Sequence, residues 1–338
     1  MTKKMTRIVV LMMVLALVFA GCSKPAEETA APEETAPVAE KITISYSTWA
    51  SDGEAAYEGM EKFKEIVETE SDGNITVNLF PANQLGKTEE QLEQLALNTI
   101  QLMSSGNPGI KELEYLALPY LMDSMDEWTT VLNSKIGQKW NEQLLEAKGI
   151  VNIGFLPRSP RIVSVNEEIN TPADFAGLKL RVPERDYYVE TFKAFGANPT
   201  PMDFGEVYSA LQTGVVSGQE NPIETIYAAG FHEIQDYLII TNHIVKPAFV
   251  STNKQFLDSL SPEYKELILK AVDEGRKYAE EIMNKQGADF EAKMEEAGMT
   301  IIRPDLAPFV EVTQGVRDTL GTSVWGEEDY QAILEMTK

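Results

Sequence analysis

Residues 42–79 carry the clearest fold signal and read ITISYSTWASDGEAAYEGMEKFKEIVETESDGNITVNL. Apolar and polar side chains alternate over 42–46 and again over 75–79, and this period of two predicts β-strands. Between these strands apolar residues recur at helical spacing, and Asp72-Gly73 is a turn signal. Strand, helix and strand in this order predict an α/β fold, with helices on the faces of a parallel or mixed sheet.

The same rhythm restarts after Gly149, where the apolar runs 150–155, 162–165 and 178–182 predict strands of a second α/β lobe. Ser261-Pro262 then begins a much longer helix, which keeps one face apolar until Gly298. At about 1.5 Å per residue this helix would exceed about 50 Å. One small lobe does not need such a length, so we expect the helix to lie across both lobes.

The composition limits the possible functions. The chain has 338 residues, of which 43% are hydrophobic and 24% charged, enough for two globular domains. Its formal charge of −24 makes general nucleic-acid binding improbable, because phosphate contacts need a basic face. A single cysteine and two histidines exclude a disulfide framework and leave little for a metal site.

Catalytic and nucleotide-binding motifs are missing from the sequence. It contains no His-Glu-x-x-His, Gly-x-Ser-x-Gly, phosphate-binding loop or spaced-glycine fingerprint. Acidic residues are so abundant that a carboxylate pair carries no information. We therefore expect no enzyme activity, no cofactor and no metal.

The N-terminus has the pattern of an export signal. A basic start is followed by the uncharged apolar run 8–20, which is too short to span a bilayer comfortably. The sequence Phe19-Ala20-Gly21-Cys22 resembles the bacterial lipoprotein box, although Phe19 replaces the usual Leu. We expect a signal peptide over 1–21, lipid attachment at Cys22 and an extracytoplasmic, lipid-anchored protein. The alternative is a conventional cleavage site near a free cysteine.

Residues 22–40 are expected to be a disordered tether. They contain the near repeat AEETAAPEETAP, which is too poor in apolar side chains to pack. Such a segment would hold the folded body away from its lipid anchor.

Four arginines form a positively charged cluster along the sequence of this acidic chain. After removal of 1–21 the chain keeps seven arginines, and Arg158, Arg161, Arg181 and Arg185 fall within 28 residues of one another. A planar guanidinium matches a carboxylate with two parallel hydrogen bonds. Arg181 ends a predicted strand, where ligands of α/β proteins usually bind. An organic anion held by arginine is one hypothesis, and ion pairs with surface Asp and Glu are the other.

Several sequence blocks resemble one receptor family. GLKLRVP (177–183), FGANPTPM (195–202), EVYSALQTG (206–214) and GQENP (218–222) resemble the core of the solute receptors of tripartite ATP-independent periplasmic (TRAP) transporters, the dicarboxylate-receptor family. Further blocks match in the right order, at 81–86, 118–120, 241–244 and 260–262. The resemblance covers nearly everything from about Lys41 to the C-terminus.

The resemblance implies a type II-like periplasmic binding protein, with two α/β lobes around a cleft and a long bracing helix. Lobe I would comprise 41–157 and about 247–285, and lobe II 158–246 and about 286–338. A monomeric receptor of this kind binds a small organic acid and delivers it to a small and a large membrane subunit. The receptor of an ATP-driven importer and a surface lipoprotein enzyme acting on small acids remain alternatives.

The family also implies particular ligand-binding residues. Arg181 is the chief carboxylate-binding position, Arg161 fits a second arginine better than Arg158, and the remaining candidates are Asn221, Phe204, Trp49 and His243. Several have alternative roles. Asn221 before Pro222 is also a good helix cap. Arg161 could form a surface ion pair, Phe204 could be core, and His243 could be a hinge or packing residue.

Two features of the first lobe bear on the ligand. Residues 101–107 read QLMSSGN, where receptors for particular sugar acids carry an acidic side chain near Gly106, so a sugar acid with many hydroxyls is less favoured. Trp49 suggests a flat or apolar part of the ligand. C4-dicarboxylates, 2-oxo acids, aromatic acids and uronates all stay open.

Replacing Cys22 by Ser tests the lipid anchor. We expect Cys22→Ser to release the protein from membranes, because the acyl chains supply the membrane affinity. Membrane partition and palmitate labelling measure this directly. Persistence of both in the variant would contradict a lipoprotein.

Overall fold

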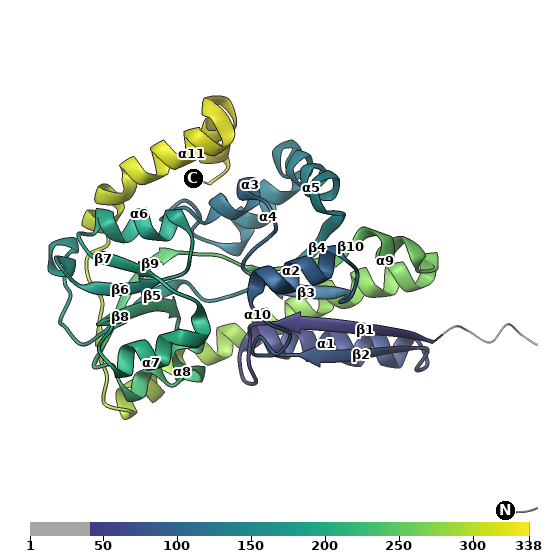
Figure 1. The fold of residues 1–338 in the computed structure, drawn as a ribbon, viewed down its shortest axis with the longest axis horizontal. Helices are drawn as coiled ribbons and strands as arrows, with labels where there is room; N and C mark the ends of the chain where they lie inside the picture. Colours follow the sequence, from purple (N-terminus) through teal and green to yellow (C-terminus); the bar gives the residue numbers. More distant parts are fainter. Residues whose placement is uncertain (1–40, 338) are drawn as a thin grey trace, which may run out of the picture. The chain divides into compact units, whose positions relative to one another are not determined.

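The computed structural model describes residues 41–337, and the predicted signal peptide, Cys22 and the tether lie outside the described residues. The strand–helix–strand order predicted for 42–79 is present as β1 (Ile42–Thr48), α1 (Ala55–Glu70) and β2 (Ile75–Phe80) (Figure 1). β1 and β2 pair in parallel, and Ile44, Ile75 and Val77 are buried. The alternation of apolar and polar residues therefore predicted correctly which face of these two strands is buried.

Two separate sheets confirm the expected pair of α/β lobes. The five-stranded sheet has the order β2-β1-β3-β10-β4, and the six-stranded sheet the order β11-β9-β5-β8-β6-β7. The additional strands of the first sheet are β3 (Leu102–Ser105), β4 (Ile150–Leu156) and β10 (Ala248–Asn253). Those of the second are β5 (Arg161–Val165), β6 (Lys179–Val182), β7 (Asn198–Pro201), β8 (Gly218–Pro222), β9 (Tyr237–Ile244) and β11 (Thr300–Ile302).

The chain crosses between the sheets twice by short extended segments. One crossing joins β4 to β5 through 157–160, and the other joins β9 to β10 through 245–247. The shorter helices are α2 (Thr88–Ala96), α3 (Lys111–Glu114), α4 (Met125–Asn133), α5 (Lys135–Lys148), α6 (Asp186–Ala194), α7 (Val207–Gln212), α8 (Ile223–Ala228) and α9 (Lys254–Ser259). Both crossings end beside the same pocket, described below.

The predicted long helix is α10 (Pro262–Glu296), and it contacts both lobes. Its first part packs on α1 and β4, and its last part packs near α8 and β11 (Figure 1). Tyr278, which the helical spacing of apolar residues between Ser261 and Gly298 places on the apolar face, is 37% exposed instead. It lies near the end of the first contact region, and no described side chain from 280 to 289 is buried. The helix therefore spans the gap between its two contact regions with a partly solvated middle.

The C-terminal helix α11 (Ala307–Met336) is interrupted by Gly326, whose φ of 78° suits glycine. It contacts α6 and β9 on one side and α3 and α4 on the other. Trp325 stacks on Trp140 of α5 with ring centroids 5.8 Å apart. Because α11 touches β9 and α6 of the second lobe as well as the helices α3 and α4 of the first, the exact lobe boundaries stay a prediction. Within residues 41–337, no helix has the length and apolarity needed to cross a membrane.

Two glycines allow α1 and α10 to approach closely. A Cβ built on Gly275 would lie 2.5 Å from the Gly59 carbonyl oxygen, and one on Gly59 would lie 2.7 Å from the Gly275 oxygen. Both neighbours are backbone, which cannot rotate away. The contact therefore requires glycine at both positions.

Replacing Gly275 by Ala is expected to lower the free energy of unfolding by about 1–3 kcal/mol, because the added methyl group overpacks the helix contact. Gly287→Ala is the matched control, since it lies in the same helix with no atom within 4 Å of the added Cβ. It should be neutral or stabilising by up to about 1 kcal/mol. Urea denaturation measures both, and equal effects would contradict the close contact.

Candidate ligand-binding site

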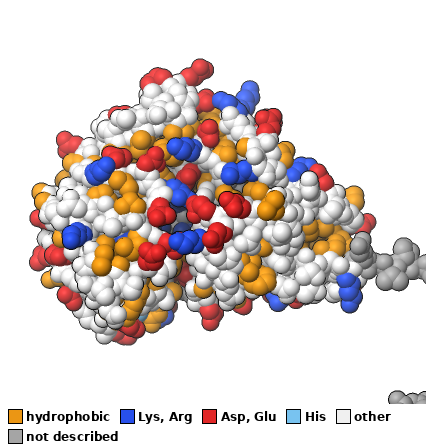
Figure 2. All heavy atoms as spheres, in the orientation of Figure 1, with side chains coloured by type: hydrophobic (Ala, Val, Ile, Leu, Met, Phe, Trp, Pro, Cys, Tyr) orange, Lys and Arg blue, Asp and Glu red, His pale blue; other side chains and the backbone are white. Residues whose placement is uncertain are grey.

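A pocket opens where elements of the two sheets face each other. It encloses about 160 Å³, and a cavity of about 150 Å³ is enough for a molecule of benzene's size. Figure 2 shows basic and acidic side chains gathered around this hollow. Of the predicted site residues, it is lined by Arg181, Arg161, Asn221, Phe204 and Trp49. His243 does not line it.

Arg181 is a buried cation without a carboxylate partner. It lies near the carboxyl end of β6, is 3% exposed, and donates from Nε and Nη2 to the Met202 carbonyl oxygen at 3.0 and 2.7 Å. No Asp or Glu oxygen in residues 41–337 lies within 4.0 Å of its guanidinium. A guanidinium has five N–H donors, so three remain after the two bonds to Met202.

The electrostatic surroundings compensate this charge only in part. Burial lowers the pKa of Arg181 to about 10, while Glu220 opposes the shift and Arg161 adds to it. The side chain nevertheless stays positive near neutral pH. Phe204 contributes a ring 6.0 Å from the guanidinium carbon, and that ring also lies 6.1 Å from Phe231 in the second lobe's core. Phe204 is therefore both a pocket wall and a packing residue.

Arg161 lines the pocket but its charge is already matched. It forms a bidentate pair with Glu220, in which Nη2 lies 2.7 Å from Oε1 and Nε contacts Oε2. Both side chains are buried. Burial alone would raise the pKa of Glu220, but the Arg161 guanidinium and a His243 hydrogen bond hold it below its usual value. The pair is buried rather than the surface ion pair of the alternative hypothesis.

Asn221 joins this pair to the pocket and does not cap a helix. Its Oδ1 accepts from Arg161 Nη2 at 3.0 Å, and its Nδ2 donates to Gln219 Oε1 at 2.7 Å. It belongs to β8, and α8 starts after Pro222 without any side-chain cap. The capping alternative for Asn221 is therefore wrong.

His243 lies behind the site. Its Nδ1 is 2.8 Å from Thr241 Oγ1 and its Nε2 is 3.1 Å from Glu220 Oε2, so both ring nitrogens have protein partners. Burial lowers the pKa of His243, which favours the neutral ring. The expectation that His243 reaches a ligand does not match this geometry. Its contacts instead orient Glu220, and through it Arg161.

Arg158, ranked below Arg161 from the sequence, is the second buried arginine without a carboxylate within 4.0 Å in the described part of the chain. Its guanidinium carbon lies 4.4 Å from the Trp49 ring centroid, and Nη2 is 3.4 Å from Thr225 Oγ1. Burial lowers the pKa of Arg158. Trp49 Nε1 is buried without a hydrogen-bond partner. Trp49 and Arg158 thus form a second polar corner of the pocket.

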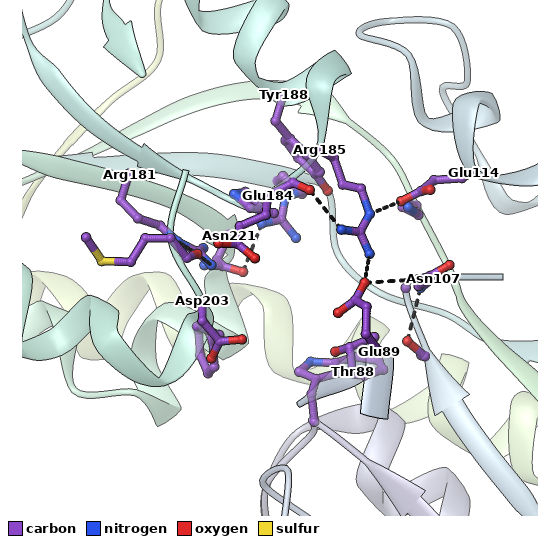
Figure 3. A pocket seen from close by; sticks show the side chains of 18 of the residues that line it. Thr88, Glu89, Asn107, Glu114, Arg181, Glu184, Arg185, Tyr188, Asp203 and Asn221 are labelled. Carbon is purple, nitrogen blue, oxygen red and sulfur yellow. Dashed lines mark hydrogen bonds and ion pairs between the residues drawn. The ribbon is translucent and has the colours of Figure 1, made fainter. Parts of the chain in front are cut away.

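Arg185 links the two sides of the pocket through carboxylates. Its Nε donates to Glu114 Oε1 of α3 at 2.6 Å, and its Nη2 to Glu89 of α2 (Figure 3). For this arginine the ion-pair hypothesis is confirmed. Both acids line the pocket together with residues 105–107. The segment QLMSSGN itself has no acidic side chain, as its sequence indicated, but the pocket around it contains two.

Sequence reasoning missed Lys246, Glu89, Glu114, Tyr187 and Tyr188, which also line the pocket. A signal existed for Lys246, since it interrupts the apolar run of residues 244–250 before Pro247. None existed for the two acids in so acidic a chain. In residues 41–337 no group of three or more His, Cys, Asp and Glu side chains is arranged to hold a metal.

The two lobes with a charged pocket between them define the class of solute-binding proteins. The family model of bacterial extracellular solute-binding proteins, family 7, matches residues 46–321. The C4-dicarboxylate-binding periplasmic protein DctP of Rhodobacter capsulatus is 31% identical over 309 residues, covering 89% of this chain and 92% of its own. The protein therefore belongs to the DctP family of TRAP transporter receptors.

Crystal structures agree with this assignment. A TRAP periplasmic solute-binding protein of Shewanella oneidensis with bound succinate superposes with a TM-score of 0.81 at 27% identity, covering 88% of this chain and 99% of its own. One of Roseobacter denitrificans with bound L-galactonate gives 0.80 at 28% identity, with the same coverage. Both of these similar structures are TRAP periplasmic solute-binding proteins.

Removing Glu220 tests the buried pair. Glu220→Ala should lower the free energy of unfolding by about 3–5 kcal/mol, because Arg161 would stay buried without its counter-charge. Glu190→Ala is the control, since Glu190 pairs with Lys193 on the surface and such substitutions stay within about 0.5 kcal/mol. Chemical denaturation gives both values. A Glu220→Ala variant as stable as the control would show that Arg161 is solvated.

Proposed function

We propose that this receptor binds a small organic acid outside the cytoplasm, with Arg181 as the clamp for its carboxylate. The observation that carries the proposal is the buried Arg181 guanidinium, which lines the pocket and, among residues 41–337, has three N–H groups without a partner and no carboxylate within 4.0 Å. A carboxylate oxygen pair matches the fork of a guanidinium. The ligand would supply the missing negative charge.

Several pocket features support a small acid as the ligand. The pocket is small, and its cationic corner at Arg158, whose guanidinium lies over the Trp49 ring, offers further donors to acceptor oxygens. Similar receptors carry succinate or L-galactonate, both acids of a few carbon atoms. Asn221 would act by accepting a hydrogen bond from Arg161, which holds the Arg161 guanidinium so that its remaining N–H groups face the pocket.

The magnitudes are consistent with useful affinity. Each charge-assisted hydrogen bond contributes about 1.5–3 kcal/mol, so a bidentate contact at Arg181 supplies several. A micromolar dissociation constant corresponds to about −8 kcal/mol. Water expelled as the lobes close over the ligand supplies the remainder. The Arg185 pairs with Glu89 and Glu114 join opposite walls of the pocket and would stabilise that closed state.

The closed receptor would then deliver its ligand to the small and large TRAP membrane subunits. The ligand shifts the population of the closed form by its differential contacts with the two lobes. Those subunits would recognise that form and accept the acid, with an ion gradient driving uptake. Lipidated Cys22 and the 22–40 tether would keep the receptor close to the membrane.

Arg181→Lys tests the clamp. Lysine keeps the positive charge and loses the planar fork, so we expect at least a tenfold loss of affinity in calorimetric titration with the acid that co-purifies or scores in a thermal-shift screen. Arg276→Lys is the matched control, because Arg276 pairs with Asp273 and Glu280 on the surface of α10. Unchanged binding by Arg181→Lys would refute the clamp.

A further inference from the structure

Lys246 is a buried amine in the same pocket that the clamp does not use. It lies in the short segment that crosses from β9 to β10, is 6% exposed, and lines the pocket. Lysine is almost never buried unless it has a charged partner. Its position at a crossing between the lobes, facing a ligand pocket, therefore needs an explanation.

The protein provides little for this amine to bind. Nζ donates to Tyr187 Oη of α6 at 2.8 Å, and no carboxylate oxygen lies within 4.0 Å of it in residues 41–337. An ammonium has three N–H donors. Two of them therefore have no hydrogen-bond partner in residues 41–337. The acid that acts on it, Glu114 of α3, already accepts a hydrogen bond from Arg185 Nε at 2.6 Å.

The charges that face Lys246 are mostly positive. Arg185 precedes α6, Arg161 starts β5, and Arg158 lies between β4 and β5. Burial, with these three arginines, lowers the pKa of Lys246 to about 7, and Glu114 opposes the shift. Burial therefore favours the neutral amine in the empty pocket and brings its titration into the range around neutral pH. A negative charge placed beside the amine would favour its protonated form.

We propose that Lys246 recognises a second anionic group of the ligand and takes up a proton when a di-acid binds, so that binding by this receptor is proton-linked. The inference rests on the proposed function, in which Arg181 holds the first carboxylate. A mono-acid held at Arg181 would leave Lys246 unmatched and bind without proton uptake. A di-acid long enough to reach the crossing segment would place its second carboxylate at the free N–H groups.

The direction of the pH dependence follows from the protonation state of Lys246 in the empty and in the ligand-bound receptor. Above about pH 7 the empty receptor must first bind a proton, so its affinity for a di-acid falls by up to about tenfold per pH unit. Below about pH 7 the amine is already charged and the affinity levels off. His243 does not interfere, because its pKa is lowered. Tyr187 does not interfere either, because burial raises its pKa well above 10.

Calorimetry of the full receptor with matched probes tests the proposal. The probes are the straight-chain α,ω-dicarboxylates from malonate to adipate, each compared with its half-amide, which has the same shape and one charge fewer. Titrations at about pH 8 in buffers of different ionisation enthalpy report the protons taken up. We expect uptake approaching one proton for the best di-acid, none for its half-amide, and at least tenfold weaker di-acid binding at about pH 8.5 than at about pH 6.5.

Lys246→Met separates this role from a structural one. The variant removes a buried amine and keeps an apolar chain of similar length, so it should fold, and unfolding experiments verify this. We expect proton uptake to vanish and di-acid affinity to fall at least tenfold, with a clearly smaller loss for the half-amide. Lys193→Met is the matched control, because Lys193 is an exposed lysine on α6. It should behave as the unmodified receptor.

The outcomes distinguish this proposal from the function on which it rests. Proton uptake that persists in Lys246→Met, or equal losses for di-acid and half-amide, would overturn the role of Lys246 and leave the acid receptor standing. Half-amide binding without any preference for the di-acid would do the same. If neither kind of acid binds the unmodified receptor, this inference fails, and the proposed function fails with it only if a thermal-shift screen of 2-oxo acids, aromatic acids and uronates also finds no ligand.

Discussion

A buried guanidinium without a counter-ion places a strict demand on the structure around it. Taking an ion out of water costs several kcal/mol even after relaxation, and only a well-placed opposite charge recovers that energy. At Arg181 the Met202 carbonyl supplies a dipole but no charge. The buried acid that acts on it most strongly, Glu220, already forms a bidentate pair with Arg161. The pocket is therefore electrostatically incomplete until an anion enters it.

The fold creates this incomplete site by bringing strand ends from two sheets to one place. β6 carries Arg181, the pairing of β5 with β8 sets Arg161 against Glu220, and the two crossing segments bring Arg158 and Lys246 to the same hollow. α10 contacts both lobes with a partly solvated middle. Hinge motion at the crossings, with α10 as a continuous brace, gives a physical route between open and closed forms.

The sequence predicted the strands and helices, because these depend on local residue patterns. It could not predict which charged side chains pair with each other, because that depends on how distant strands align. The alternation of 42–46, the long helix and the strand that ends at Arg181 are local, and all were found. The neutralisation of Arg161 depends on the register of β5 against β8, which no spacing along the chain reveals. The same is true of His243, whose nitrogens are taken by Thr241 and Glu220. No spacing along the chain shows which of the four arginines lacks an acid, so the order of Arg161 and Arg158 as ligand-binding residues stays a prediction.

A crystal structure of the receptor with its acid bound would show whether Arg181 holds the carboxylate. We expect one carboxylate of the ligand in a bidentate contact with the Arg181 guanidinium, with N–O distances of about 2.7–2.9 Å, while Arg161 keeps its pair with Glu220. A ligand whose acid group binds elsewhere, or a bound state in which Arg181 turns to a protein carboxylate instead, would contradict it.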